Sequence, residues 1–374
     1  AVHEAMAFAA AFKLPVIFVV ENNGWAELTP TSKMVKVDRI AQRASGYGIP
    51  AATLNGTDPI AVRDSFAQAA DHARAGNGPS LLEFKVPRLW GHYNRDIEHY
   101  RPKADRQAAE AQDPIGLLSQ RLIAAGFMTK SQIDAVIATQ TAAVEEMTES
   151  IMAGAEPDVA TARDHVQSRP VANVPVVTET RTLSFIEAVN LALRTELEND
   201  PATLVYGEDV GFGGGIFGGS RYLQRDFGEA RVFDMPIAEN AILGSAVGAA
   251  ICGMKPIVEI MWADFIFVAL DQVVNQAANI RYITEGKTTC PMVIRTQQGV
   301  TPGSCAQHSQ SIEAILAHIP GVKVALAASA TDAYALLRAA AADPDPVVVI
   351  EARGLYQEKA EVQLTDGAEP AGKA

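Results

Sequence analysis

The 374-residue chain has little cysteine, a deficit of positive charge and no hydrophobic run of membrane-spanning length. Its three cysteines, Cys252, Cys290 and Cys305, are odd in number and lack metal-ligand spacing, which argues against a secreted disulfide framework and a zinc site and favours a reducing cytoplasm. The net charge of -13 disfavours the nucleic-acid backbone as a partner. No segment is long and apolar enough to span a membrane, so we expect no membrane partner.

The sequence also lacks an initiating methionine and begins inside a helical pattern. Its apolar opening is interrupted by Lys13 and Pro15 and is followed by no small-residue cleavage site, so it is not typical of a signal peptide. We therefore expect a fragment or a processed chain, located in the cytoplasm.

Two regions of the chain alternate between helical and strand patterns, which is typical of parallel α/β sheets. In the first region, residues 14–20 are continuously apolar, which predicts a strand covered on both faces. Further strands are predicted around 51–54 and at 80–86, and Asp58-Pro59 predicts the start of a helix between them. In the second region, a helix is predicted at 183–199 and strands at 203–206, 257–261, 292–295, 322–326 and 347–351.

The segment between these regions has a different pattern. Thr129 and Gln132 form a capping box ahead of an amphipathic helix, and Pro157, Pro170 and Pro175 mark a linker. The predicted fold class is therefore α/β, with two doubly wound domains joined by a helical arm and linker. The predicted boundaries are 1–103, 104–180 and 181–355, followed by a polar, truncated tail at 356–374.

A single carboxylate, Glu239, stands at the start of an almost wholly apolar helix, in the stretch from Asp234 to Ala250. Such a helix is expected to be buried, and burial raises the pKa of a carboxyl group because it disfavours the charged form. Glu239 is therefore a candidate proton donor. The alternative is a helix-start glutamate that accepts hydrogen bonds from the backbone amides of the first turn.

Three other stretches combine polar residues with loop patterns. Residues 21–25 follow an apolar strand, where α/β sheets bind ligands, although the two asparagines also suit a turn. Residues 90–102 are dense in His, Arg, Asp and Tyr, which predicts a functional loop, the alternative being a solvated connection. Residues 207–215 are rich in glycine but lack phosphate-loop spacing, which favours a flexible, close-packed loop.

Taken together, these motifs resemble the thiamine diphosphate-dependent decarboxylating component of the 2-oxoacid dehydrogenase complexes, with alpha and beta subunits fused in one chain. The resemblance rests on the order of four motifs: FKLPVIFVVENN at 12–23, Gly91-His92, PIAE at 236–239 and AQHSQ at 306–310. Residues 1–155 resemble the carboxyl-terminal part of the alpha subunit, and residues 180–355 the first domain of the beta subunit.

The resemblance implies thiamine diphosphate and Mg²⁺ as cofactors. Asn23 would ligate the ion through its side-chain oxygen and Trp25 through its backbone carbonyl, whereas the family's anionic Asp ligand would precede Ala1, so weak cofactor binding is expected. Glu239 would hydrogen-bond a ring nitrogen of the aminopyrimidine, whose imino group would take the proton from the thiazolium carbon and so generate the ylid. Phe265 would lie against the pyrimidine, or alternatively be a core aromatic.

Three further residues match family positions. His92 falls in the mobile loop near the diphosphate and the lipoyl channel, and Arg101 in the Tyr-Arg element that follows. Tyr93 stands where mitochondrial relatives carry a regulatory serine, so phosphorylation is not expected there. His308 matches the histidine that helps acyl transfer to lipoamide; judged from its surroundings alone, it would be a core or turn histidine.

The implied function is oxidative decarboxylation of a small 2-oxoacid, with acyl transfer to the lipoyl group of a partner acyltransferase. The cofactor would lie between alpha-type and beta-type domains, and a homodimer of the fused chain is expected. One alternative is an acetoin-cleaving dehydrogenase component. Others are a transketolase-like transferase and a catalytically silent fragment with a structural or interaction role.

Overall fold

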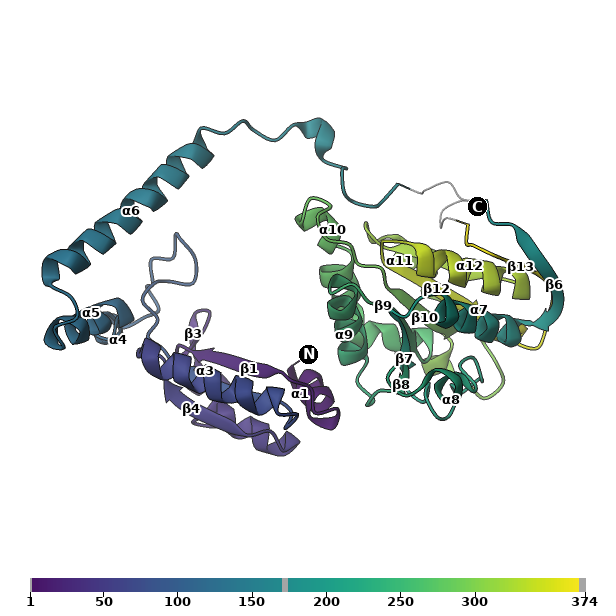
Figure 1. Ribbon diagram of the computed structural model, residues 1–374, viewed down its shortest axis with the longest axis horizontal. Coiled ribbons are helices and arrows are strands. Elements are labelled where there is room, and N and C mark those ends of the chain that lie inside the picture. Colours follow the sequence, from purple (N-terminus) through teal and green to yellow (C-terminus); the bar gives the residue numbers. More distant parts are fainter. Residues whose placement is uncertain (1, 170–173, 370–374) are drawn as a thin grey trace. The chain divides into compact units, whose positions relative to one another are not determined.

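A computed structural model describes residues 2–169 and 174–369 and divides them into two units, Val2–Pro157 and the segment from Asp158 onward (Figure 1). Pro170, which we used to mark the linker, and the last five residues of the predicted tail lie outside the described residues.

The first unit is built on a parallel three-stranded sheet in the order β1-β5-β4, as the alternation of helical and strand patterns predicts. A short antiparallel pair, β2 and β3, follows β1. The elements of this part are α1 (Val2–Ala11), β1 (Ile17–Asn22), β2 (Trp25–Ala26), β3 (Thr29–Pro30), α2 (Thr31–Met34), η1 (Ile40–Tyr47), β4 (Ala51–Asn55), α3 (Pro59–Arg74) and β5 (Ser80–Lys85).

Alternate residues of β5 serve the two faces of this sheet, because successive side chains of a strand point in opposite directions. Leu81 packs with α1 and the 3-10 helix η1, whereas Leu82 and Phe84 pack with α3. Figure 1 shows α3 running along one face of the sheet. Asp58 caps α3 by accepting from the backbone amides of Ile60 and Ala61, as the Asp-Pro start predicts.

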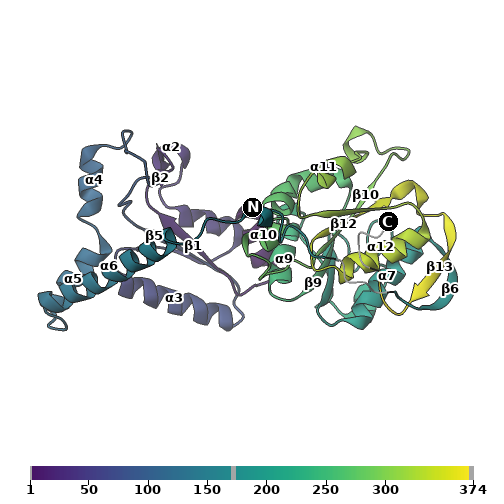
Figure 2. The ribbon, with the colours of Figure 1, turned by 90° about the horizontal axis from the view of Figure 1, so that it is seen from above.

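The predicted helical arm is present in the first unit, as α4 (Lys103–Glu110), α5 (Pro114–Ala124) and α6 (Lys130–Met152). Figure 2 shows these three helices in succession. The capping box at Thr129 forms as predicted, with Gln132 and Thr129 each accepting from the other's backbone amide.

The second unit contains a parallel six-stranded sheet in the order β11-β12-β10-β9-β7-β8. Both predicted α/β regions are therefore confirmed. The elements are β6 (Val177–Ser184), α7 (Phe185–Asn199), β7 (Thr203–Gly207), α8 (Leu223–Phe227), β8 (Val232–Asp234), α9 (Glu239–Ile251), β9 (Lys255–Ile260), η3 (Ala263–Ala269), the π-helix η4 (Gln272–Ala277), α10 (Ile280–Ile283), β10 (Val293–Gln298), η5 (Ala306–His308), α11 (Glu313–Ala317), β11 (Lys323–Ala327), α12 (Ala330–Ala342), β12 (Val347–Ala352), η6 (Arg353–Leu355) and β13 (Lys359–Thr365).

Helices cover this sheet as the doubly wound pattern requires. α7 and α12 pack together and share a buried cluster with Val205, Ile257 and Val349 of the sheet. The small residues of α9 let it pack closely on β9, η3 and η4.

Two ends of the second unit differ from the predicted boundaries. The segment expected to be a polar tail contains β13, which pairs antiparallel with β6, and Tyr356 before it is buried. β6 begins at Val177, inside the predicted linker. The alternation of polar and apolar residues in these strands is short, which explains why the sequence pattern did not reveal them.

Part of the linker is attached to the second unit. The Ser168 backbone amide and hydroxyl both donate to Asp345 Oδ2 at 2.6 Å. Asp345 is also paired with Arg281 at 2.5 Å and with Lys323 at 3.2 Å. This buried cluster of charges fixes the linker at Ser168.

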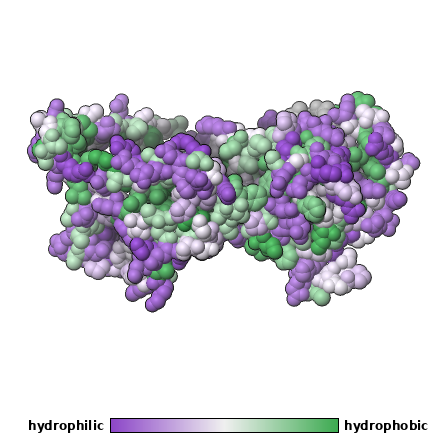
Figure 3. Space-filling model, turned by 60° about the horizontal axis from the view of Figure 1, so that its bottom comes forward, coloured by the Kyte–Doolittle hydropathy of each residue, from purple (hydrophilic) through white to green (hydrophobic). Residues whose placement is uncertain are grey.

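Figure 3 shows hydrophilic residues over much of one face, interrupted by smaller hydrophobic patches. Within residues 2–169 and 174–369, no helix is both long and apolar enough to cross a membrane.

Candidate functional site

Several polar and aromatic side chains of the second unit follow the carboxyl ends of neighbouring strands. Glu208 follows β7, Trp262 follows β9, and Arg353 follows β12. Because these strands run parallel in one sheet, the residues lie at the same edge, where open α/β sheets bind ligands.

Glu239 is the first residue of α9 and is half-buried, whereas the sequence suggested a buried carboxyl. The helix after it is mostly buried, as predicted. The chain reaches Glu239 through the β8 end, where Asp234 accepts from the Gly211 amide at 2.6 Å. The glycine-rich loop is thereby tied to the segment that leads into α9.

Glu208 is a residue of this site that sequence analysis missed. Burial, followed by repulsion from the Glu239 carboxylate, raises the pKa of Glu208 to about 7, although the backbone amide of Ala238 offsets part of the rise. Its Oε1 is buried without a hydrogen-bond partner. The available signal was the Glu-Asp pair directly after an apolar strand, which we assigned to a close-packed loop. Two neighbouring carboxyls, one half-protonated near neutral pH, can hold and exchange a proton.

Two aromatic rings pack against His308. Its ring centroid lies 5.1 Å from Trp262 and 5.4 Å from Phe265, both in edge-to-face orientation. Phe265 belongs to η3 and is only half-buried, so its ring is partly open rather than enclosed in the core. The structure therefore brings the predicted residues Phe265 and His308 into contact.

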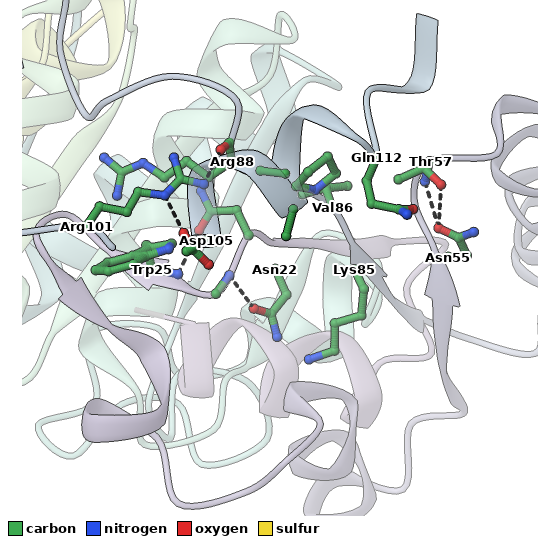
Figure 4. A pocket seen from close by; sticks show the side chains of 15 residues that line it. Asn22, Trp25, Asn55, Thr57, Lys85, Val86, Arg88, Arg101, Asp105 and Gln112 are labelled. Atoms are coloured by element: carbon green, nitrogen blue, oxygen red, sulfur yellow. Dashed lines mark hydrogen bonds and ion pairs between the residues drawn. The ribbon is translucent and has the colours of Figure 1, made fainter. Parts of the chain in front are cut away.

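The first unit has a pocket of about 450 Å³ at the carboxyl ends of its three strands (Figure 4). Asn22 and Asn23 come from the β1 end, Asn55 from the β4 end and Lys85 from the β5 end. The full lining is Asn22, Asn23, Gly24, Trp25, Asn55, Thr57, Lys85, Val86, Pro87, Arg88, Arg101, Asp105, Ala108, Ala109 and Gln112. It unites the predicted residues Asn23, Trp25 and Arg101.

Glu83 organises the floor beside this pocket and was also missed from the sequence. It is fully buried in β5 and accepts from Asn22 Nδ2 at 2.6 Å and Thr53 Oγ1 at 2.8 Å, and it pairs with Lys85 at 3.0 Å. Although burial alone would raise it, these bonds and the Ala41 amide lower the pKa of Glu83 to about 2. A charged acid inside an apolar run carried no sequence signal for this role.

The predicted magnesium ligands make a turn. Asn23 is exposed, and its Oδ1 accepts from the Trp25 backbone amide at 2.9 Å, as the alternative interpretation of this stretch suggested. Among the residues that the structure describes, no three His, Cys, Asp or Glu side chains are grouped to hold a metal ion.

The wall of the pocket is cationic. Arg88 Nη2 is buried without a hydrogen-bond partner, and Lys85 and Arg101 also line the cavity. This donor set fits an anionic group such as a diphosphate. For a metal ion the lining offers the neutral oxygens of the asparagines and one carboxylate, Asp105, which is already engaged by Arg101.

The predicted functional loop is held from one end. Asp96 accepts from the His92 amide at 2.8 Å and from the Tyr100 hydroxyl at 2.6 Å, and the Tyr100 bond is the main cause that lowers the pKa of Asp96 to about 2. Arg101 is buried, donates to the Arg88 carbonyl at 2.6 Å and bonds Asp105. His92 itself is half exposed and lies outside the pocket lining, 3.7 Å from Glu27.

Two families of known proteins match the two parts of the chain. Residues 1–160 match the dehydrogenase E1 component family, and residues 181–359 match the pyrimidine-binding domain of transketolase. The boundary between the two matches falls in the linker.

Several curated relatives of the chain are beta subunits. The chain is 45% identical over 193 residues to the 2-oxoisovalerate dehydrogenase subunit beta of Bacillus subtilis (strain 168), covering 51% of this chain and 59% of the relative. It is 44% identical over 193 residues to the pyruvate dehydrogenase E1 component subunit beta of Acholeplasma laidlawii, with the same coverage of 51% and 59%. It is 40% identical over 204 residues to the acetoin:2,6-dichlorophenolindophenol oxidoreductase subunit beta of Cupriavidus necator, covering 52% and 60%. The chain thus spans less than two thirds of each relative's length.

Proposed function

Because a dehydrogenase E1 segment is followed here by a transketolase-type pyrimidine-binding domain, we propose that this chain takes part in thiamine diphosphate-dependent oxidative decarboxylation of a 2-oxoacid. The observation that carries the proposal is the group at the carboxyl edge of the six-stranded sheet. It places the Glu208–Glu239 carboxyl pair and the rings of Phe265 and His308 on loops of one sheet.

Thiamine diphosphate, when bound, would supply the carbon nucleophile and the electron sink that decarboxylation of a 2-oxoacid requires. Glu239 holds a proton against a ring nitrogen of the aminopyrimidine. Glu208, with its pKa near 7, can donate or accept a proton at neutral pH as the protonation of Glu239 changes. Phe265 offers its partly open ring as the surface against which the pyrimidine stacks.

The pocket of the first unit is proposed to bind the diphosphate. Lys85, Arg88 and Arg101 supply positive charge, and Asn23 with the Trp25 carbonyl is proposed to ligate Mg²⁺. We further propose that the two units correspond to alpha-type and beta-type subunits fused in one chain, which functions as a homodimer in the cytoplasm.

The proposed acceptor is the lipoyl group of a partner acyltransferase. His92, on its exposed loop, is proposed to guide the lipoyl arm, and His308 to assist acyl transfer. The domain boundaries at 103 and 180 remain part of this proposal, whereas the boundary at 355 is moved so that the beta-type domain includes β13.

The test is to purify the full-length gene product and to measure ferricyanide reduction and lipoyl-domain reduction with pyruvate, branched-chain 2-oxoacids and acetoin, with and without thiamine diphosphate and magnesium. We expect cofactor-dependent turnover of a 2-oxoacid, and near-complete loss of it in Glu239→Gln while cofactor binding stays detectable. Wild-type rates in Glu239→Gln would remove this residue from the mechanism.

Acetoin cleavage is a second candidate, favoured by the similarity to the acetoin oxidoreductase subunit of Cupriavidus necator. The same assay separates the two, since an acetoin-cleaving component turns over acetoin in preference to every 2-oxoacid. A catalytically silent role predicts neither cofactor binding nor turnover in the full-length protein.

A further inference from the structure

The loop that carries His308 has few buried anchors of its own. It leaves β10 at Gly299 and reaches His308 through mostly exposed residues, among them Pro302, Gly303 and Cys305. Cys305 has a φ of 55°, in the left-handed region that a residue with a Cβ adopts at a cost. A loop with little apolar burial needs other contacts to hold one conformation.

One buried guanidinium provides such contacts at both ends of the loop. Arg353 Nη2 lies 2.5 Å from the Gly299 carbonyl, 2.8 Å from Ser304 Oγ and 3.4 Å from the His308 carbonyl. Arg353 is only 6% exposed and is the first residue of η6. It directly follows β12, the strand that pairs with β10 in the sheet. It therefore ties the loop to a rigid part of the sheet.

The same guanidinium also supports the histidine through an aromatic ring. Its carbon lies 4.1 Å from the Trp262 ring centroid, and Trp262 in turn contacts the His308 ring. Arg353 thus touches the backbone of His308 and the ring that packs against its imidazole.

This placement is costly for the folded protein. Arg353 Nε and Nη1 are buried without hydrogen-bond partners, and leaving such donors unpaired is destabilising. Simple stabilisation of the fold therefore does not account for a charged group here, because an apolar side chain of similar length would fill the space without unpaired donors.

We propose that Arg353 is a positioning residue that fixes the 299–308 loop, and with it the imidazole of His308, for transfer of the acyl group to the lipoyl acceptor. The role in acyl transfer rests on the function proposed above, whereas the effect on the loop does not.

The test uses Arg353→Met, which keeps the length of the side chain and removes its donors, and Arg353→Lys, which keeps the charge. Arg338→Met is the matched control. Arg338 is also buried, in the same unit, but its guanidinium bonds Glu196, Tyr334 and Thr365.

The first measurement is hydrogen–deuterium exchange of peptides covering 299–309 in the protein without cofactor. Loss of bonds to a charged donor predicts exchange about tenfold faster or more in Arg353→Met, and an intermediate rate in Arg353→Lys. In Arg338→Met this loop should exchange at the wild-type rate. An unchanged rate in Arg353→Met, or acceleration spread evenly over the whole unit, overturns the proposal.

The second measurement compares lipoyl-domain reduction with ferricyanide reduction in the full-length protein. Arg353→Met should lose lipoyl activity about tenfold more than ferricyanide activity, and adding it to His308→Ala should cause little further loss, because residues that act through one another are not additive. Equal losses in both assays, or additive losses in the double variant, contradict the positioning role. Absence of ferricyanide activity in the wild-type protein would instead refute the proposed function, while the exchange measurement would still decide whether Arg353 holds the loop.

Discussion

Replacing Glu208 with glutamine tests the carboxyl pair without requiring any catalytic activity. Burial and the Glu239 charge raise the pKa of Glu208 from 4.5 to about 7. Because the pKa of Glu208 is higher in the folded than in the unfolded state, its contribution to the free energy of unfolding is fully present below about pH 4.5 and is lost as the pH rises through 7. Glutamine resembles the protonated acid and cannot ionise, so the variant avoids that loss.

The magnitude follows from the shift. At about 1.4 kcal/mol for each tenfold change, ionising a fully shielded Glu208 would cost the folded state roughly 3 kcal/mol relative to the unfolded chain. Because Glu208 is only half-buried, solvent screening reduces this cost, and we expect Glu208→Gln to be more stable than wild type by about 1.5 kcal/mol at pH 8. The advantage should disappear near pH 4.

Urea unfolding at a series of pH values, followed by circular dichroism, measures this difference. Glu229→Gln is the control, because Glu229 is an exposed glutamate of the same unit and its replacement changes the net charge equally. If Glu208→Gln and Glu229→Gln show the same pH profile, the raised pKa and the coupling to Glu239 are refuted.

Other predictions concern both units. Glu83→Gln should destabilise the first unit by roughly 2–4 kcal/mol at neutral pH, because the hydrogen bond with Asn22 and the ion pair are weakened in a buried site. Urea unfolding at several pH values tests this, since the lowered pKa of Glu83 makes the stability advantage of the wild type fade between about pH 4.5 and 2. A stability difference that persists unchanged down to about pH 2 would contradict the prediction. Gly321→Ala should lower the melting temperature strongly, since the φ of Gly321 is 92° and an added Cβ would lie 2.2 Å from the Ala278 carbonyl oxygen. Gly253→Ala is the control, because Gly253 has the same φ but open space around it, and equal decreases in melting temperature in the two variants would refute the clash. His92→Ala should reduce lipoyl acylation more than ferricyanide-coupled decarboxylation, and equal loss in both assays would remove His92 from the lipoyl channel.

The fold was readable from the sequence where periodicity was strong. Apolar runs predicted the parallel strands, and the residues at 58–59 and 129–132 predicted helix starts that the structure confirms. These signals are local, so they survive without knowledge of the partner elements. β13 was missed because its pairing with β6 joins segments far apart in the sequence, and neither strand has a long apolar pattern.

The candidate site was predictable only in part. Family motifs pointed to Asn23, Glu239 and His308, but the residues that hold or tune them carry no local signal. Glu83, Glu208 and Arg353 act through contacts with residues distant in sequence, so their roles appear only once the strands are adjacent. The sequence also overestimated the burial of Glu239, because a helix that is apolar along its length can still expose its first residue at the sheet edge.

The attachment of Ser168 to Asp345 sets a limit on how far the two units can separate. Only about 15 residues connect Met152 at the end of α6 to Ser168, and a fully extended chain of that length reaches about 50 Å. A tether this short keeps the units at an effective concentration in the millimolar range, whatever the concentration of the protein itself. Dilution of the protein therefore does not lower this effective concentration, and the two units are always present in equal number.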